Sequence, residues 1–282
     1  MAALILVLVG PVRSRAASTS RSIFSLAGAV LNSARVRANN HGNYTNIIFL
    51  HHSVGYELIR QGRIRERLTK SGFELYDHHY NGPGLTRPDG KPAGYSYNIP
   101  NDNTDPDGLL GIFEQRPYRL PLNALSGLLQ HEVIVLKSCF LAIRTLSADD
   151  LERQKKEYLA IRMRMKQHPD KLFIIVTSPP ANPAETDAGS AFRARRLATW
   201  LASDEFHQGV ANVCVFDLFN LLAENNPDSP DRNMLRSQYR TGADSHPNPV
   251  ANETAGSVFT EFVIEAAKNY AERKRQYNEK KP

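Results

Sequence analysis

Short apolar runs separated by longer amphipathic stretches set the pattern of hydrophobic and polar positions along this chain. Runs of this kind, rich in β-branched and aromatic residues and bounded by turn-forming residues, predict buried strands. We expect five of them, at residues 47–50, 73–76, 133–136, 172–177 and 213–216. Continuous apolar runs are typical of parallel strands that are covered by helices on both faces.

The segments between the apolar runs carry helical spacing. Ser147 and Asp150 match a capping box, and the helix that it opens has apolar residues at seven-residue intervals, namely Leu151, Tyr158 and Met165. A further helix is expected from about Asp187. The last helix has the clearest apolar stripe, formed by Ala255, Val258, Phe259, Phe262, Val263, Ala266, Ala267 and Tyr270. Strands that alternate with helices in this way predict an α/β fold with a central parallel five-stranded sheet.

The length of the chain favours one folded domain, preceded by a segment of different composition. With 282 residues and 41% hydrophobic content, one sizeable core is expected, over residues 41–282. Residues 1–40 begin with the apolar run Ala2–Gly10 and continue rich in Arg and Ser, without acidic residues. This run is too short to span a bilayer, so no integral membrane span is expected. A signal-like segment predicts export, and a transit peptide is the alternative.

The positive net charge does not point to nucleic acid as a partner. The formal charge is +6, but five arginines precede Glu57, the first acidic residue, and without them the remainder carries +6 − 5 = +1. We therefore expect no basic face for phosphate groups. The two cysteines, Cys139 and Cys214, lie inside apolar runs without CxxC spacing, so we expect buried thiols and neither a disulfide framework nor a redox motif.

One serine and one histidine fall where two distant segments should meet. Ser53 follows the first predicted strand directly, and His246 precedes the last predicted helix. Both positions open on the carboxyl edge of a parallel sheet, where ligands bind in folds of this class. A serine becomes a useful nucleophile when a base removes its proton, and an acid can orient that base. The sequence therefore predicts a catalytic triad of Ser53, His246 and Asp244.

Each member of this triad also has a purely structural alternative. Ser53 could cap the helix that follows it. Asp244 could bond its own turn, and His246 could be an ordinary loop histidine.

At these residues the chain resembles the SGNH (GDSL-like) hydrolase superfamily. The matching segments are Phe49-Leu50-His51-His52-Ser53, the glycines Gly82 and Gly84, Ser178-Pro179-Pro180 and Asp244-Ser245-His246-Pro247-Asn248. The resemblance spans roughly residues 47–270. It implies a flavodoxin-like three-layer α/β/α fold and ester hydrolysis through an acyl-enzyme, commonly on acylated carbohydrates or lipids.

The chain departs from the superfamily pattern around the triad. His51-His52 replaces the usual Gly-Asp before the nucleophile, and Asp244 precedes the histidine by two residues where the superfamily has three. This difference leaves the orienting role of Asp244 open.

A further departure concerns the oxyanion hole. Lys137-Ser138-Cys139 stands where the superfamily has an asparagine. We expect the backbone N–H groups of Ser53 and Gly84, or the Ser138 hydroxyl, to bind the oxyanion in its place. His52, beside the nucleophile, is expected to contact the substrate.

A possible calcium loop is the one cofactor site that the sequence suggests. Asn103–Glu114 has oxygen-bearing side chains at the first, third and fifth places, with Gly108 at the sixth and Glu114 at the twelfth. The residues before it do not predict the entering helix of an EF-hand, and an ordinary turn is the alternative. No other cofactor is expected.

These features together predict a secreted serine esterase that removes acyl groups, first of all acetyl groups, from a carbohydrate ester. The predicted cleft loops are polar and aromatic. This composition favours a small-molecule or polysaccharide ester as the substrate over an ester that carries a long acyl chain. One alternative is a non-catalytic module that binds glycans through Tyr80, Tyr95 and Tyr97. A second is a metal-dependent hydrolase, with zinc held by the imidazoles His51, His52, His78 and His79.

Overall fold

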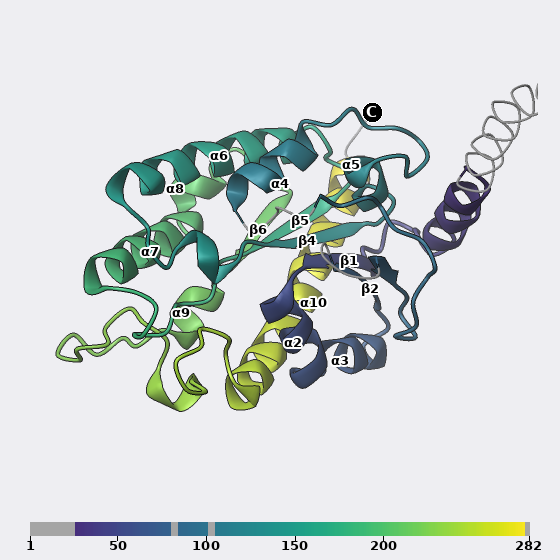
Figure 1. Ribbon diagram of the computed structural model, residues 1–282. Helices are drawn as coiled ribbons and strands as arrows, with labels where there is room; N and C mark the ends of the chain where they lie inside the picture. The colour runs from purple at the N-terminus through teal and green to yellow at the C-terminus, as the bar shows by residue number, and fades with distance from the viewer. Residues whose placement is uncertain (1–25, 80–83, 101–104, 280–282) are drawn as a thin grey trace, which may run out of the picture.

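Six strands form one central sheet with helices on both faces in the computed structural model, which describes residues 26–79, 84–100 and 105–279 (Figure 1). The strands are β1 (Asn46–His51), β2 (Glu74–His79), β3 (Gly84–Thr86), β4 (Val133–Lys137), β5 (Leu172–Val176) and β6 (Val213–Phe216). They lie in the order β3-β2-β1-β4-β5-β6. Every neighbouring pair is parallel except β2 and β3.

The predicted α/β/α class is confirmed, but the predicted count of five strands is wrong. The five expected strands are the five parallel ones, and numbered among themselves they run 2-1-3-4-5, the flavodoxin-like order. The sixth strand, β3, has three residues and returns antiparallel along β2. A strand of this length is too short to show any periodicity in the sequence.

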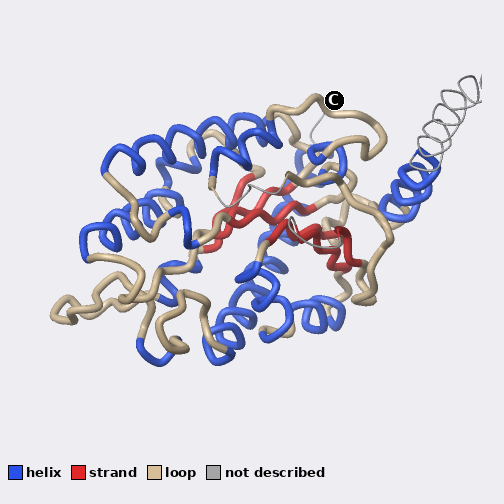
Figure 2. The backbone as a smooth tube through the Cα atoms, viewed as in Figure 1, coloured by secondary structure: helices blue, strands red, loops and turns tan. Residues whose placement is uncertain are grey.

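Helices flank the sheet in two layers, which Figure 2 shows as blue segments on either side of the red strands. They are α2 (Ser53–Gln61), α3 (Ile64–Lys70), α4 (Pro106–Phe113), α5 (Ala124–Leu128), α6 (Ala148–Lys166), α7 (Ala188–Leu201), α8 (Asp204–His207), α9 (Leu218–Leu222) and α10 (Pro249–Glu279). Two short 3-10 turns are η1 (Phe140–Ala142) and η2 (Ser237–Tyr239). The predicted capping box is confirmed, since Ser147 and Asp150 bond each other at the start of α6.

The hydrophobic core has two halves, one on each face of the sheet. Along β1, Ile48 and Leu50 pack with residues of α4, α5, α6 and α7, whereas Ile47 and Phe49 pack with residues of α2, α3 and α10. This alternation follows the two-residue period of a strand. The predicted stripe of α10 is buried at Ala255, Phe259, Val263, Ala267 and Tyr270, but Val258 is 41% exposed.

Part of residues 1–40, which we predicted to lie outside the folded domain, belongs to the folded structure. Residues 26–37 are helical, and Ala29 and Val36 are buried. The Ser33 hydroxyl donates to the side chain of Gln130 at 2.6 Å, which ties this helix to the end of α5. The apolar run Ala2–Gly10 lies outside the described residues. Within the described part of the chain, no helix has the length and apolar character needed to cross a membrane.

Two glycines bring α2 and α10 into close contact. A Cβ added to Gly256 would lie 2.5 Å from the Cα atom of Gly62, so neither position accommodates a side chain without a shift. The Asn252 amide adds a hydrogen bond to the Gln61 side chain at 2.8 Å. This contact fixes the helix that follows Ser53 against the helix that follows His246, although about 190 residues separate them in the sequence.

Candidate active site

Ser53 lies at the turn where β1 passes into α2. His51 is the last residue of β1, His52 occupies the N-cap position and Ser53 is the first residue of the helix. The Ser53 Oγ atom lies 2.8 Å from Nε2 of His246. The Ser53 hydroxyl therefore contacts His246. The structural alternative, in which Ser53 caps the helix, is wrong, because His52 occupies the N-cap position.

His246 is held between Ser53 and Asp244. Its Nδ1 atom lies 2.7 Å from Oδ1 of Asp244, and its backbone N–H donates to the same oxygen at 3.1 Å. The Asp244 carboxylate thus accepts from the backbone of its own turn and also contacts the imidazole. The structural alternative and the predicted contact with His246 are therefore both present. Burial would raise the pKa of Asp244, but the hydrogen bonds from His246 outweigh it and hold the pKa below its ordinary value. An ionised Asp244 favours the tautomer with hydrogen on Nδ1 and a bare Nε2 that faces the serine.

Replacement of Asp244 by Asn should lower kcat about 100- to 10,000-fold, because an amide can donate to Nδ1 and so turn Nε2 into a donor. We expect KM to change little. The measurement is steady-state hydrolysis of an aryl ester, with the fold checked by circular dichroism.

Asp228→Asn is the matched control, because Asp228 is an exposed acid on the loop before η2. Equal rates for Asp244→Asn and the control would show that Asp244 does not orient His246.

Hydrogen bonds from the segment after β5 hold the loop that carries His246. Ser245 is fully buried, and its hydroxyl accepts from the Asn182 backbone N–H at 2.9 Å and donates to the Glu185 carboxylate. The Asn182 side chain donates to the carbonyl oxygens of Gly242 and Asp244, at 3.1 and 3.0 Å. The segment after β5 therefore holds the loop that carries His246 in place. Sequence reasoning missed this role, because hydrogen bonds across some 60 residues leave no local pattern.

An aromatic ring supports the imidazole from the side of β4. The Phe140 ring lies edge-on to His246, with 5.1 Å between ring centroids. Phe140 forms a small buried cluster with Val54 and Cys139. These residues were not predicted as part of the site, although their place just after two adjacent strand ends was a usable signal. β1 and β4 flank the point where the strand order reverses, which is where this class of fold opens a crevice.

The expected oxyanion donors differ in how the structure places them. The N–H of Ser53 belongs to the first turn of α2, whose N–H groups have no intrahelical partners and carry the positive end of the helix dipole. Gly84 begins β3 opposite His79 with φ +93°, and a Cβ there would lie 2.8 Å from the Tyr95 carbonyl oxygen. The role of the Gly84 N–H stays a prediction, since residues 80–83 lie outside the described residues.

Two polar residues at the end of β4, Lys137 and Ser138, are buried and hydrogen-bonded within the fold. The Ser138 hydroxyl is buried and lies 2.7 Å from the Tyr158 hydroxyl, which separates it from the other site residues. The Ser138 hydroxyl is thus engaged by Tyr158, and its role as an oxyanion donor stays a prediction. Lys137 is buried, and its ammonium donates to the Ser138 carbonyl oxygen at 2.8 Å. Burial lowers the pKa of Lys137.

His52 lies next to Ser53 and close to β2. Its ring centroid is 5.2 Å from that of His79. Burial, followed by the charges of Lys137, His51 and His246, lowers the pKa of His52, so its ring is neutral at neutral pH. Contact with substrate stays a prediction for this residue.

The four imidazoles suggested as zinc ligands are used in different ways. His51 bonds Asp77, whereas His78 lies on the opposite face of β2 and accepts from the Tyr97 backbone N–H at 3.1 Å. Among residues 26–79, 84–100 and 105–279, no group of three or more His, Cys, Asp or Glu side chains is arranged to hold a metal ion.

The calcium prediction falls partly outside the described residues, because Asn103 and Thr104 are not among them. The rest of the segment is α4, with Asp105 as its N-cap and Glu114 as its C-cap. A helix rises 1.5 Å per residue, so Asp107 and Glu114 are about 10 Å apart along it. The described part therefore does not form the loop of an EF-hand.

Two of the three tyrosines expected to form a glycan-binding surface loop, Tyr95 and Tyr97, are engaged in the fold. Tyr97 is fully buried, and its hydroxyl lies 2.9 Å from Nε2 of His131. Tyr95 is partly buried and donates to the Pro121 carbonyl oxygen at 2.8 Å. Tyr80 lies outside the described residues. The two described rings are part of the packing against the sheet, which removes the surface that the non-catalytic alternative requires of them.

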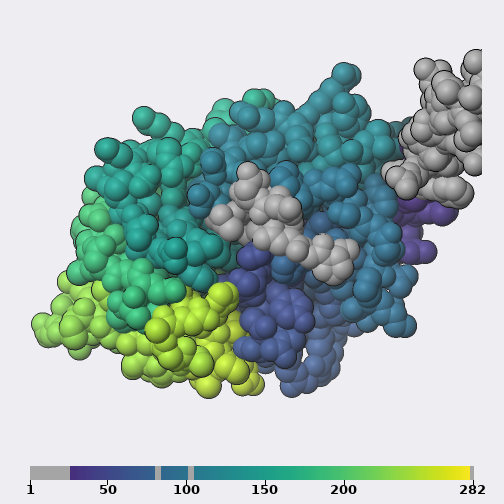
Figure 3. All heavy atoms as spheres, in the orientation of Figure 1, coloured from purple at the N-terminus to yellow at the C-terminus, as the bar shows by residue number. Residues whose placement is uncertain are grey.

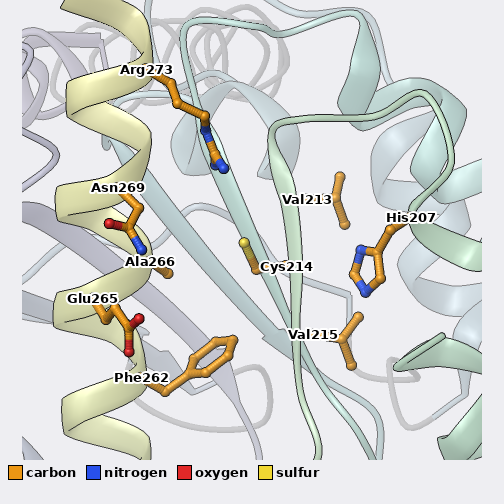
Figure 4. Close-up of a pocket in the computed structure, with 9 residues that line it drawn as sticks. All are labelled: His207, Val213, Cys214, Val215, Phe262, Glu265, Ala266, Asn269 and Arg273. Atoms are coloured by element: carbon orange, nitrogen blue, oxygen red, sulfur yellow. The ribbon is translucent and has the colours of Figure 1, made fainter. Parts of the chain in front are cut away.

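A separate pocket of about 330 Å³ lies between β6 and the second half of α10 (Figure 4). Phe262, which lines it, is 13 residues into α10, about 20 Å along the helix from the end nearest His246. The sulfur of Cys214 faces this pocket, and burial raises the pKa of its thiol, which makes it a poor nucleophile. Both cysteines are free thiols; Cys139 is buried as expected, whereas Cys214 is only partly buried.

The chain matches no protein-family model and no curated protein. Three solved structures are similar in overall arrangement. A protein from Bacteroides fragilis, provisionally described as an acylhydrolase, is 12% identical with a TM-score of 0.46, over 78% of this chain and 87% of the other. One from Streptococcus pneumonia, provisionally described as a platelet activating factor, is 14% identical with a TM-score of 0.47, over 88% and 99%. A GDSL-like lipase from Bacteroides thetaiotaomicron is 10% identical with a TM-score of 0.43, over 78% and 88%. At these values, the case for any reaction rests on the geometry of the site itself.

Proposed function

We propose that this protein is a serine ester hydrolase that works through an acyl-enzyme. One observation carries the proposal: Ser53 Oγ, His246 and Asp244 are joined by contacts of 2.8 and 2.7 Å at the carboxyl edge of a parallel sheet. The order is hydroxyl, imidazole and carboxylate, which is the order that nucleophilic catalysis by serine requires.

In the first half of the reaction, Ser53 Oγ attacks the ester carbonyl carbon while its proton passes to Nε2 of His246. The carbonyl oxygen becomes an oxyanion, which the N–H groups at the start of α2 stabilise. The C–O bond to the alcohol then breaks, and the alcohol leaves with the proton from Nε2. This leaves the acyl group on Ser53.

In the second half, a water molecule attacks the acyl carbon and gives a proton to Nε2 of His246. The bond to Ser53 Oγ breaks, the proton returns to the serine, and the free acid leaves. Asp244 keeps its charge in both halves and stabilises the imidazolium each time that it forms.

The surroundings of Ser53 favour a short acyl group on a polar alcohol. The apolar residues nearest the triad form a small cluster, Val54, Cys139 and Phe140, in which a short acyl chain would find contacts. A groove of about 610 Å³ is lined by Tyr56 and Ile59 of α2, by charged side chains of α2 and α3 and by the loop after β3. An aromatic ring beside charged side chains is a lining that suits a sugar ring and its hydroxyls. An acetylated sugar or polysaccharide is the proposed substrate.

The experiment is a release assay with the full chain. Aryl acetate, butyrate and octanoate test the acyl length, and acetylated polysaccharides test the alcohol. We expect turnover that falls with chain length and acetate release from at least one polysaccharide. Faster turnover of octanoate would overturn the choice of acyl group, and the lack of any turnover would favour a non-catalytic role.

A further inference from the structure

The N-terminal helix, residues 26–37, is held on the fold by an inner face that includes polar groups. This face is formed by four buried residues, Ala29, Asn32, Ser33 and Val36. The Ser33 hydroxyl donates to the Gln130 side chain at 2.6 Å, and the Val36 carbonyl oxygen accepts from the Asn46 side chain at 2.6 Å. Because these hydrogen bonds tie the helix to the end of α5 and to the start of β1, its orientation on the protein is fixed.

The outer face of the N-terminal helix is apolar. Residues three and four apart share one face of a helix. The exposed apolar residues follow this spacing, at Leu26, Ala27, Val30, Leu31 and Ala34. Leu26 is 50% exposed, Val30 46% and Leu31 69%. The helix therefore places two polar side chains against the protein and its largest apolar side chains outside, which reverses the usual arrangement of a surface helix.

The helix α6 shows the usual arrangement in the same protein. Its buried residues include Leu151, Tyr158 and Met165. Most of its exposed residues are charged, and both signs occur among them: Asp149, Glu152, Arg153, Lys156, Arg164 and Lys166. Water solvates a face of this kind readily. The apolar outer face is thus a particular property of the N-terminal helix.

The charges beside the apolar outer face are positive. Within residues 26–37 the charged side chains are those of Arg35 and Arg37, which are both exposed, and no acidic residue precedes Glu57 in the sequence. Leu31 and Arg35 also line a hollow of about 210 Å³ between the helix and the segment that carries Tyr95. An aliphatic side chain beside a guanidinium complements a phospholipid, because the first contacts acyl chains and the second binds phosphate.

The N-terminal helix lies far from the predicted triad. It is bonded to Asn46, the first residue of β1, whereas Ser53 follows the last residue of that strand. About 20 Å of strand lies between these two points. Figure 1 shows the helix in purple at the margin of the molecule. Contact of its outer face with a large surface therefore involves no residue of the triad.

We propose that the outer face of the N-terminal helix docks on an anionic phospholipid surface. The helix lies along the surface, and Leu26, Val30 and Leu31 enter the boundary between headgroups and acyl chains. Arg35 and Arg37 pair with the lipid phosphates. The apolar stripe and the uniformly positive charge beside it support a lipid surface as the occupant. The proposal goes beyond the proposed ester hydrolysis and does not depend on it.

The apolar contact is tested by co-sedimentation of the full chain with vesicles of phosphatidylcholine that contain about 30% phosphatidylserine. We expect the wild type to sediment with these vesicles. The variant Val30→Asn/Leu31→Asn should have a partition coefficient about 10-fold lower or less, because it loses two apolar side chains without a change of charge. Leu122→Asn/Met163→Asn is the matched control, since both of these residues are 49% exposed elsewhere on the surface, and it should bind like the wild type.

The contribution of charge is tested with Arg35→Gln/Arg37→Gln. We expect binding to the anionic vesicles to weaken about 10- to 30-fold, with no change on phosphatidylcholine alone. Arg164→Gln/Lys166→Gln is the matched control, because it removes two exposed cations from α6. Equal binding of the two charge variants would overturn the proposed pairing with lipid phosphates.

The fold of each variant is checked by its thermal midpoint of unfolding, which should stay unchanged because all the replaced side chains are solvent-accessible. A wild type that does not sediment with the anionic vesicles would overturn the proposal, as would a Val30→Asn/Leu31→Asn variant that binds like its control. A dimer that forms without lipid and is lost in this variant would assign the outer face to a second copy of the chain instead. No measurement here uses esterase activity, so a failure of the proposed function would leave these results unaffected.

Discussion

Replacement of Ser53 by Ala should lower ester turnover about 10,000-fold or more while leaving the fold intact. The serine hydroxyl is the atom that would form the acyl bond, and removal of a serine nucleophile typically leaves only the contribution of binding and the oxyanion site. The side chain caps no helix and is bonded to His246, so its loss should cost little stability. The measurements are kcat on an aryl acetate and the thermal midpoint of unfolding.

Ser71→Ala is the matched control for this variant. Ser71 is an exposed serine at the end of α3, and its hydroxyl donates to the Arg67 carbonyl oxygen. We expect wild-type turnover from it. A Ser53→Ala variant that keeps more than about a tenth of the wild-type rate would rule out nucleophilic catalysis by this residue.

Replacement of His246 by Ala should lower kcat by a similar factor, because no base then takes the proton from Ser53. When residues act as one unit, the effects of their mutations on kcat are strongly non-additive. The double variant Ser53→Ala/His246→Ala should therefore have a kcat no lower than that of the slower single variant. The experiment is a double-mutant cycle on kcat with the same aryl acetate.

His41→Ala is the control here, since His41 is exposed and lies before β1. If the two effects on kcat multiplied in the double variant, Ser53 and His246 would be acting independently and the proposed pairing would be wrong.

The parallel part of the fold could be predicted because each strand is buried on both faces and stands out as an apolar run. The contact between Ser53 and His246 could be predicted because chain direction and strand order bring the end of β1 and the start of α10 to one edge of the sheet. Figure 3 shows the outcome on the surface, where the blue region of α2 borders the yellow-green region that leads into α10. Local periodicity and the direction of parallel strands were enough for this much.

What could not be predicted depends on side-chain direction and long-range contacts. Ser138 follows β4 as expected, but its hydroxyl turns into the core toward Tyr158. Tyr97 belongs to a polar, Tyr-rich segment, yet its ring fills the space above Gly127, where a Cβ would lie 2.2 Å from it. The short strand β3 and the anchoring of Ser245 by Asn182 likewise leave no periodic signal in the sequence.

The acid of the triad shows how spacing alone can mislead. Asp244 is one residue closer to the histidine than the resemblance implied, which left its role open. In the structure, the same carboxylate oxygen reaches both the backbone N–H and Nδ1 of His246. The tight turn between them makes the shorter spacing compatible with orientation of the imidazole.

The most direct test of the Ser53 and His246 pairing is covalent labelling with a serine-reactive aryl phosphonate, followed by mass spectrometry of the digested protein. We expect one adduct on Ser53 in the wild type, none in Ser53→Ala, and labelling of His246→Ala that is slower by about 100-fold or more. A wild type that takes up no phosphonate, or that carries the adduct on a different serine, would contradict this pairing.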